Sequence, residues 1–307
     1  MSLTVNNIEN YNNMSEFCIK EKFVFFYGES LDLRGKETEK LINESSMSIL
    51  IKYIPEKGFI NINSDEFPHY MLMNFIEKLD TDYILIESTT LSVAEILLLL
   101  HYINQLENDI KLSILYVEPE EYKLKDIKDN FQEFELSNHF EGFYNIRPYN
   151  LLIDSTTNNK EKAEIVVLLG FEDNRIGYLL EMDEGQKYKS YVPLLGLPAF
   201  RTGWENIALS RNIRHFNSDF KKLEFAGASN PYQVMNKLEE IKNKSDYEKI
   251  LIAAFGTKPS AIGTSLFLVN NFKNKNNKVG IIYDFPKKKE NRTMGTGKVY
   301  NYIIKKQ

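Results

Sequence analysis

Short, continuous apolar runs recur along the chain, and polar stretches rich in glycine, proline, serine or asparagine separate them. Runs of four to eight apolar residues are typical of strands that are covered on both faces, as in parallel sheets. The pattern predicts strands at Phe23–Tyr27, Ser48–Ile54, Asp82–Ile86, Lys111–Val117, Ala163–Leu169, Ser190–Leu195, Leu223–Ala226, Lys249–Phe255 and Lys278–Tyr283, with a last, edge strand at Val299–Ile304.

Segments of helical character lie between these runs. They are expected at Lys36–Asn43, from Asp65 to Leu79, at Val93–Leu106, from Arg175, at Trp204–Asn212, at Tyr232–Lys242 and at Ala261–Asn270. Strands that alternate with crossover helices predict an α/β protein with mostly parallel, doubly wound, Rossmann-like sheets.

A chain of 307 residues favours two domains. Residues 1–20 are polar and rich in asparagine, and we expect a flexible N-terminal arm there. The polar segment 154–162 then separates one α/β lobe at 21–153 from a second lobe at 163–307.

Composition narrows the function classes. A net charge of −5 argues against broad nucleic-acid binding. With one cysteine, Cys18, and no evident signal peptide, the expected compartment is the cytoplasm. The longest apolar run, Ile96–Leu100, is too short to cross a membrane. Four scattered histidines lack metal-ligand spacing, so neither a metal nor a cofactor is expected.

Ligands of such sheets bind beyond the carboxyl ends of the strands. The clearest loop there is Gly256-Thr257-Lys258-Pro259-Ser260. Gly256 permits a tight turn, Ser260 is a candidate cap for a helix beginning near Ala261, and backbone N–H groups beside the Lys258 ammonium form a candidate anion site. The alternative is a plain turn with a proline before the helix.

Other strand-end loops offer weaker candidates. Ser88 and Thr89 carry hydroxyls that suit a phosphate or ribose, or they belong to a capping segment in which Ser92 and Glu95 form a capping box. Glu172 and Asp173 are candidate general bases beside Arg175, although acids at a helix start often only complement its dipole.

Two further segments follow the same logic. Arg201 suits a phosphate and Trp204 a base, although a core position is the competing interpretation for the tryptophan. Ser229 or Asn230 is expected to cap the helix that follows. The basic tail Lys287–Lys298 is a candidate lid over an anionic ligand, or a solvated loop.

The strand followed by GTKPSAIG and a helix loosely resembles the glycine–threonine–lysine turn of CRISPR-associated Rossmann-fold (CARF) sensor domains. The serine- and threonine-rich loop after Asp82–Ile86 is similar in kind to a ligand loop of those domains. The resemblance implies a bacterial or other prokaryotic antiviral-defence protein that senses cyclic oligonucleotides or related messengers, and it carries over Thr257 and Lys258. The chain departs from the pattern because it lacks a second glycine before Gly256 and a recognisable effector region.

The sequence therefore favours a nucleotide-binding, Rossmann-like sensor or partner subunit, with a nucleotide or another phosphorylated small molecule as ligand. One alternative is a transferase or hydrolase that acts on a nucleotide-like substrate. Another is a structural subunit that binds a protein partner or a second copy of itself. Whether any reaction is catalysed stays open.

Overall fold

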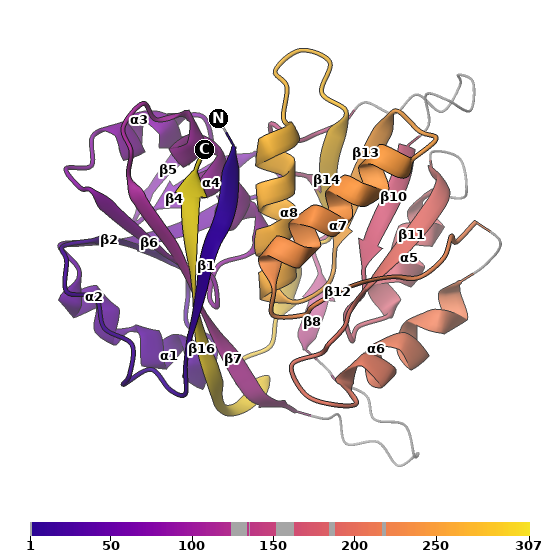
Figure 1. Ribbon diagram of the computed structural model, residues 1–307, viewed down its shortest axis with the longest axis horizontal. Coiled ribbons are helices and arrows are strands. Elements are labelled where there is room, and N and C mark those ends of the chain that lie inside the picture. The colour runs from indigo at the N-terminus through magenta and orange to yellow at the C-terminus, as the bar shows by residue number, and fades with distance from the viewer. Residues whose placement is uncertain (1, 124–133, 135, 152–162, 184–187, 217–218) are drawn as a thin grey trace. The chain divides into compact units, whose positions relative to one another are not determined.

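The computed structural model describes residues 2–123, 134, 136–151, 163–183, 188–216 and 219–307 (Figure 1). The fold is mixed α/β, and internal contacts divide it into two compact units. Unit 1 comprises Met1–Leu124, Glu135–His139 and Lys287–Gln307, and unit 2 comprises Lys125–Phe134 and Phe140–Pro286. The C-terminal residues thus belong with the N-terminal unit, which differs from the expected lobes at 21–153 and 163–307. The expected linker at 154–162 lies outside the described residues.

Unit 1 is built on an eight-stranded mixed sheet. Its order is β1 (Leu3–Tyr11), β16 (Thr293–Lys306), β7 (Lys111–Tyr122), β6 (Tyr83–Glu87), β2 (Val24–Tyr27), β3 (Met47–Ile54), β4 (Phe59–Ile62) and β5 (Asp65–Pro68). The central neighbours from β7 to β3 pair in parallel, and the flanking pairs are antiparallel. The expectation of a mostly parallel sheet is therefore wrong for this unit.

The helices of unit 1 are α1 (Leu33–Thr38), α2 (Lys40–Glu44), α3 (Met71–Glu77) and α4 (Val93–Gln105). Helix α4 is apolar around its whole circumference, and every residue from Val93 to Ile103 is buried. A helix of that composition belongs inside the protein. The predicted capping box of Ser92 and Glu95 is confirmed at its start.

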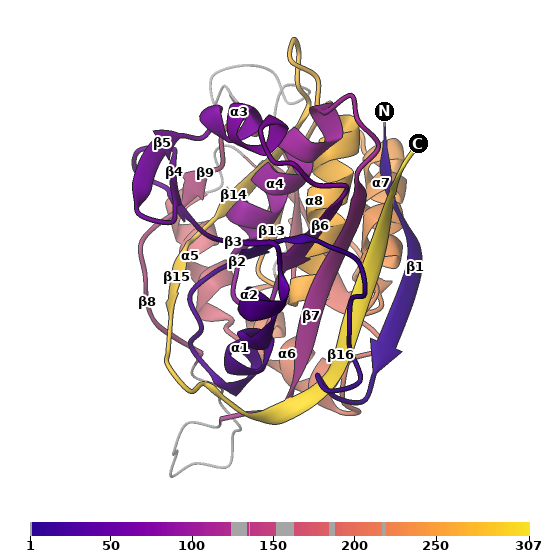
Figure 2. The same cartoon turned by 90° about the vertical axis from the view of Figure 1, so that its left-hand side faces the viewer.

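The N-terminal segment is a strand, so the prediction of a flexible arm is wrong. Strand β1 pairs with β16 along its length, and the two lie side by side in both views (Figures 1 and 2). Leu3 and Val5 are buried at alternate positions, while Asn6 and Asn7 after them are exposed and lie at a shift in the strand register. Strand β16 accordingly lies between β1 and β7, and it is not the edge strand that the sequence predicted.

The helix expected from Asp65 to Leu79 is a hairpin strand followed by a shorter helix. Strands β4 and β5 pair antiparallel, and α3 begins only at Met71. The preceding turn between β3 and β4 contains Gly58, and the turn between β4 and β5 contains Asn63, both with positive φ. Positive φ is a conformation that glycine and asparagine adopt with little strain, so these residues set the hairpin.

Unit 2 is built on a six-stranded sheet. Its order is β12 (Glu224–Ala226), β11 (Tyr188–Gly196), β10 (Ala163–Leu168), β13 (Lys249–Ala254), β14 (Val279–Tyr283) and β9 (Tyr144–Asn145). The pairs from β12 to β14 are parallel, and only β9 is antiparallel to its neighbour among these strands. Outside both large sheets, β8 (Ser137–Phe140) pairs with β15 (Pro286–Lys288).

The helices of unit 2 are α5 (Asn174–Asp183), α6 (Trp204–Asn212), α7 (Pro231–Lys244) and α8 (Lys258–Asn271), with the short 3₁₀ helix η2 (Ile213–His215). Apolar residues of α5 and α6 share a core cluster with alternate residues of β10 and β13. Helices α7 and α8 pack against each other (Figure 1). Gly263 permits this close approach, because a Cβ there would lie 2.7 Å from the Cβ of Val234.

His101 generates a prediction about acid stability. Its side chain lies in α4 and is 6% exposed, and burial, with a smaller contribution from His69, lowers its pKa to about 4. The unfolded chain takes up the proton near pH 6.5 and the folded chain does so only near pH 4, so stability is lost as the pH falls through that window. Between pH 7 and pH 4.5 the free energy of unfolding of the parent chain falls. We expect this fall to be about 2 kcal/mol smaller in the His101→Gln variant, measured by urea denaturation.

The matched control is His139→Gln, because His139 is exposed. This variant is expected to keep the full pH dependence of the parent chain. Equal slopes of stability against pH in the His101 variant and the parent would refute the assignment.

Candidate functional site

The parallel strands of unit 2 reverse their order next to β10. The chain proceeds from β10 to β11 and β12 on one side, and then returns to β13 and β14 on the other. The loops on either side of such a reversal diverge and leave a crevice at the carboxyl ends of the strands. A small cavity of about 20 Å³ lies there. Its walls come from the ends of β10, β11 and β12, from the loop after β13 and from the starts of α7 and α8: Leu168, Leu169, Leu194, Leu195, Gly196, Ala226, Gly227, Ala228, Val234, Gly256, Thr257 and Ser260.

Small residues bring backbone to the surface of this crevice. A Cβ at Gly256 would lie 2.7 Å from Ser260 Oγ, and one at Gly227 would lie 2.8 Å from Gln233 Oε1. Because the volume corresponds to about one water-sized group, the crevice can take a single oxygen atom of a ligand and not a whole nucleotide.

The loop Gly256–Ser260 is at this crevice, but its hydroxyls are already engaged. Thr257 caps α8, since its Oγ1 accepts from the Ser260 N–H at 3.3 Å and donates to the Ala228 carbonyl at 2.8 Å. Ser260 Oγ donates to the Thr257 carbonyl at 2.6 Å. The expected Ser260 cap of a helix from Ala261 is therefore wrong: α8 begins at Lys258, whose half-buried side chain belongs to the first turn.

Arg175 is buried in an ion pair. Its Nε and Nη2 donate to the two carboxylate oxygens of Asp284 at 2.6 and 2.5 Å, and its guanidinium lies 4.5 Å from the centroid of the Phe255 ring. Burial acts to lower the pKa of Arg175, but the Asp284 carboxylate outweighs burial and holds that pKa above its usual value. Its Nη1 donates to the Phe255 carbonyl at 3.4 Å. The side chain therefore ties α5 to the ends of β13 and β14, and it does not line the crevice.

Asp173 is also buried and paired, at 2% exposure. Its carboxylate forms ion pairs with Arg211 at 3.3 Å and with Arg214, and it lies 3.2 Å from His215 Nε2. Its neighbour Glu172 is half-buried, and the Glu172 carbonyl accepts from the Arg175 N–H at 3.3 Å. The geometry thus gives Asp173 a role in joining the loop after β10 to α6 and η2.

The loop after β11 carries Arg201 and leads into α6. Arg201 is exposed, and its carbonyl accepts from the Trp204 N–H at 3.1 Å. The Trp204 ring is half-buried and packs edge-on against Phe171, with 5.7 Å between the ring centroids. Asn230, the other predicted cap, is confirmed at the start of α7, where its Oδ1 accepts from the Gln233 N–H.

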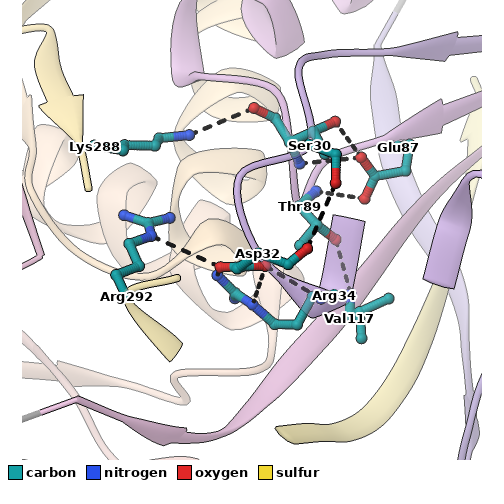
Figure 3. Close-up of polar contacts among 9 residues, drawn as sticks. Ser30, Asp32, Arg34, Glu87, Thr89, Val117, Lys288 and Arg292 are labelled. Atoms are coloured by element: carbon teal, nitrogen blue, oxygen red, sulfur yellow. Dashed lines mark hydrogen bonds and ion pairs between the residues drawn. The ribbon is translucent and has the colours of Figure 1, made fainter. Parts of the chain in front are cut away.

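Ser88 and Thr89 belong to unit 1, in the loop after β6. Ser88 Oγ donates to the Leu115 carbonyl at 2.8 Å, and Thr89 Oγ1 accepts from the Val117 N–H at 3.0 Å. Both side chains are buried, so their hydroxyls join the loop to β7. Figure 3 shows the contact of Thr89 with Val117.

Glu87, which the sequence did not single out, organises this second strand-end cluster. Its buried carboxylate accepts from the backbone N–H of Thr89 at 2.8 Å and of Thr90 at 3.0 Å, and from the Thr90 hydroxyl. Thr90 Oγ1 in turn accepts from the Gly28 N–H at 2.8 Å. The loops after β2 and β6, where the strand order of unit 1 reverses, are thereby held together.

The basic tail packs on these loops (Figure 3). Lys288 Nζ donates to the Thr90 carbonyl at 3.4 Å, and Arg292 Nε lies 4.0 Å from Asp32, which also pairs with Arg34 at 2.7 Å. Burial acts to raise the pKa of Asp32, but hydrogen bonds and charge from Arg34 outweigh burial and lower it. The expected loose lid is largely strand, since β15 and β16 cover most of it. The Asp-Leu-Arg spacing after Gly28 is the sequence signal for this ion pair.

No protein-family model and no curated protein matches the chain. Within the described residues, no group of three or more histidine, cysteine, aspartate or glutamate side chains is placed to hold a metal ion. No helix in the described part of the chain is long and apolar enough to cross a membrane.

The Arg175–Asp284 pair generates a prediction about stability. Asp284→Ala leaves a buried guanidinium without its counter-charge, and we expect a loss of about 3–5 kcal/mol in the free energy of unfolding, measured by urea denaturation. The double variant Arg175→Met with Asp284→Ala removes the stranded charge and is expected to recover at least half of the loss.

An exposed ion pair in the same unit supplies the control. Lys278 and Glu248 lie 3.1 Å apart with side chains 55% and 68% exposed, and Glu248→Ala is expected to cost less than about 1 kcal/mol. A loss of similar size in the Asp284 and Glu248 variants would show that burial does not distinguish the two pairs.

Proposed function

We propose that the chain binds the phosphate of a nucleotide-like ligand at the carboxyl edge of the unit 2 sheet, and that it acts as a sensor or partner subunit. One observation carries the proposal: the end of β11 and the loops after β10, β12 and β13 meet at a single crevice beside the point of strand-order reversal. In doubly wound sheets this is the position at which ligands bind.

The strand order supports a Rossmann-like interpretation of unit 2. Numbered by their order among the parallel strands, β12-β11-β10-β13-β14 read 3-2-1-4-5. That is the order of the first five strands of a dinucleotide-binding sheet. Helices α7 and α8 and helices α5 and α6 are the candidates for its two covering layers.

The first turn of α8 supplies the attraction for an anion. In the first turn Pro259 has no N–H and the Ser260 N–H is bound by Thr257 Oγ1, so the turn offers the Lys258 N–H and the partial positive charge of a 14-residue helix, and Lys258 adds a full charge at the first position. Because the Thr257 and Ser260 hydroxyls are engaged in capping, the ligand contacts in this proposal come from Lys258 and the backbone of Gly256–Lys258. The crevice takes one phosphate oxygen, and the nucleoside would lie outside it, towards the exposed Arg201.

The proposal is for binding without turnover. The expected base of an enzyme was Glu172 or Asp173 and its expected clamp was Arg175 or Lys258; of these, Asp173 and Arg175 are buried and ion-paired. The same turn, Gly256-Thr257-Lys258, carried the resemblance to CARF sensor domains, so a role in prokaryotic defence is part of the proposal. Ser88 and Thr89 are not part of this site, since their hydroxyls bond to β7 in the other unit.

The test is calorimetric titration of the full chain with mono-, di- and cyclic nucleotides. We expect saturable binding of at least one of them, and Lys258→Ala to weaken it about tenfold or more, because a charge-assisted contact contributes roughly 1.5–3 kcal/mol.

The matched control is Lys275→Ala, an exposed lysine on the loop after α8, which should leave the affinity unchanged. Binding that survives Lys258→Ala undiminished would remove this turn from the site. The absence of binding by every nucleotide in the panel would overturn the proposed function.

A further inference from the structure

A larger cavity lies elsewhere in unit 1, at the amino ends of the parallel strands. Its volume is about 660 Å³, which is within the range of small-molecule pockets. The starts of β6 and β7, the end of β16, strand β1 and the segment Phe17–Glu21 form its walls. The Glu87 cluster is at the carboxyl end of the same sheet, so the two sites are at opposite edges.

The wall formed by β1 and β16 presents hydrogen-bond acceptors. Asn301 is 5% exposed, and its Nδ2 donates to Glu9 Oε2 at 2.9 Å. The Tyr11 hydroxyl donates to the same oxygen at 3.0 Å. No described residue donates to Asn301 Oδ1, although this atom is buried. A buried acceptor without a donor costs about 1–3 kcal/mol, and a donor from outside the chain, such as water or an ammonium group, would offset this cost.

Tyrosine rings flank these acceptors. Burial, with a smaller contribution from the bond to Glu9, raises the pKa of Tyr11 to about 12, so the Tyr11 hydroxyl stays a hydrogen-bond donor. Tyr83 stands on the β6 side of the cavity, with its hydroxyl 2.8 Å from Ser113 Oγ. Phe17 packs edge-on against Tyr11, with 5.5 Å between the ring centroids.

Two of the four lysines of the cavity make contacts with groups other than Glu9 and Asn301. Lys111 pairs with Glu21 at 2.5 Å, and Lys306 donates to the Leu106 carbonyl. Four acids of the walls, Glu9, Glu21, Asp82 and Asp109, match its four lysines, so the cavity has no net charge that would select an anion. The ligand preference of the cavity is set by the Glu9 carboxylate, by Asn301 Oδ1, which has no hydrogen-bond donor among the described residues, and by the rings of Tyr11 and Tyr83.

We propose that this cavity binds a small molecule that carries a primary ammonium group on an aromatic body. The ammonium donates to Glu9 and to Asn301 Oδ1, and the body lies against Tyr11 and Tyr83. An ammonium has three donors and no acceptor, so it fits a site that offers acceptors, and aromatic faces attract a cation further. This site is independent of the nucleotide crevice, which lies in unit 2.

Three probes that share one ring test the charge requirement on the unaltered chain. Tyramine carries the ammonium, N-acetyltyramine is its neutral analogue, and 3-(4-hydroxyphenyl)propionate carries a carboxylate instead. Titration calorimetry is expected to show saturable binding of tyramine and affinities at least tenfold weaker for the other two. Equal affinities for the three probes, or no binding of tyramine, would overturn the proposal.

Cys18 provides a second readout, because it lines the cavity, is exposed and is the only cysteine of the chain. Tyramine at saturation is expected to slow the reaction of its thiol with 5,5′-dithiobis(2-nitrobenzoate) several-fold. A reaction rate that does not change at saturating tyramine would place the bound amine outside the cavity and would contradict the proposal.

A substitution completes the design. Glu9→Gln is expected to weaken tyramine binding at least tenfold, while Glu56→Gln, an exposed acid in the turn between β3 and β4, should leave it unchanged. The circular dichroism spectrum of each variant establishes that it is folded. A folded Glu9 variant with parental tyramine affinity would exclude Glu9 from the site.

Discussion

Buried charge must be paired, and this constraint decides which strand-end residues of the protein remain available for a ligand. In unit 1 the Glu87 carboxylate is saturated by backbone N–H groups and the Thr90 hydroxyl. In unit 2 Arg175 and Asp173 are held by Asp284 and by the cations of α6 and η2. These charges fix loops at the edges where parallel strands end. They are therefore part of the framework, although the same residue types in the same loops are what a sequence search for catalytic groups selects.

Once these groups are assigned to the framework, the proposed anion site at the unit 2 edge depends on backbone and on the half-buried Lys258. Among the described residues that line the crevice there is no carboxylate and no histidine, so the proposal is for binding. The small volume of the crevice also favours binding over catalysis, because an enzyme that acts on a nucleotide encloses the reacting atoms and excludes water from them.

Hydrophobic runs predicted most of the parallel strands, because a strand covered on both faces consists of consecutive apolar residues. They missed β1, β4 and β5, in which the apolar residues alternate with polar ones or form only short runs. These strands form because they pair with β16 or, through tight turns, with each other. The position of β16 depends on β1, some 290 residues earlier, and no local pattern encodes such a pairing. The loop Gly256–Ser260 was found from its glycine and hydroxyls, but the Arg175–Asp284 pair joins residues 109 positions apart and has no local signal.

Strand β16 gives unit 1 a physical link between its two edges. Because β16 is antiparallel to β7, the chain passes Lys288 and Arg292 at the carboxyl edge and then reaches Asn301 and Ile303 at the amino edge. The cavity exists only while β16 pairs with both β1 and β7, since these pairings bring Glu9 to Asn301. A ligand bound there would stabilise the paired state in proportion to its occupancy, and the contacts of Arg292 with the loop after β2 depend on the same strand.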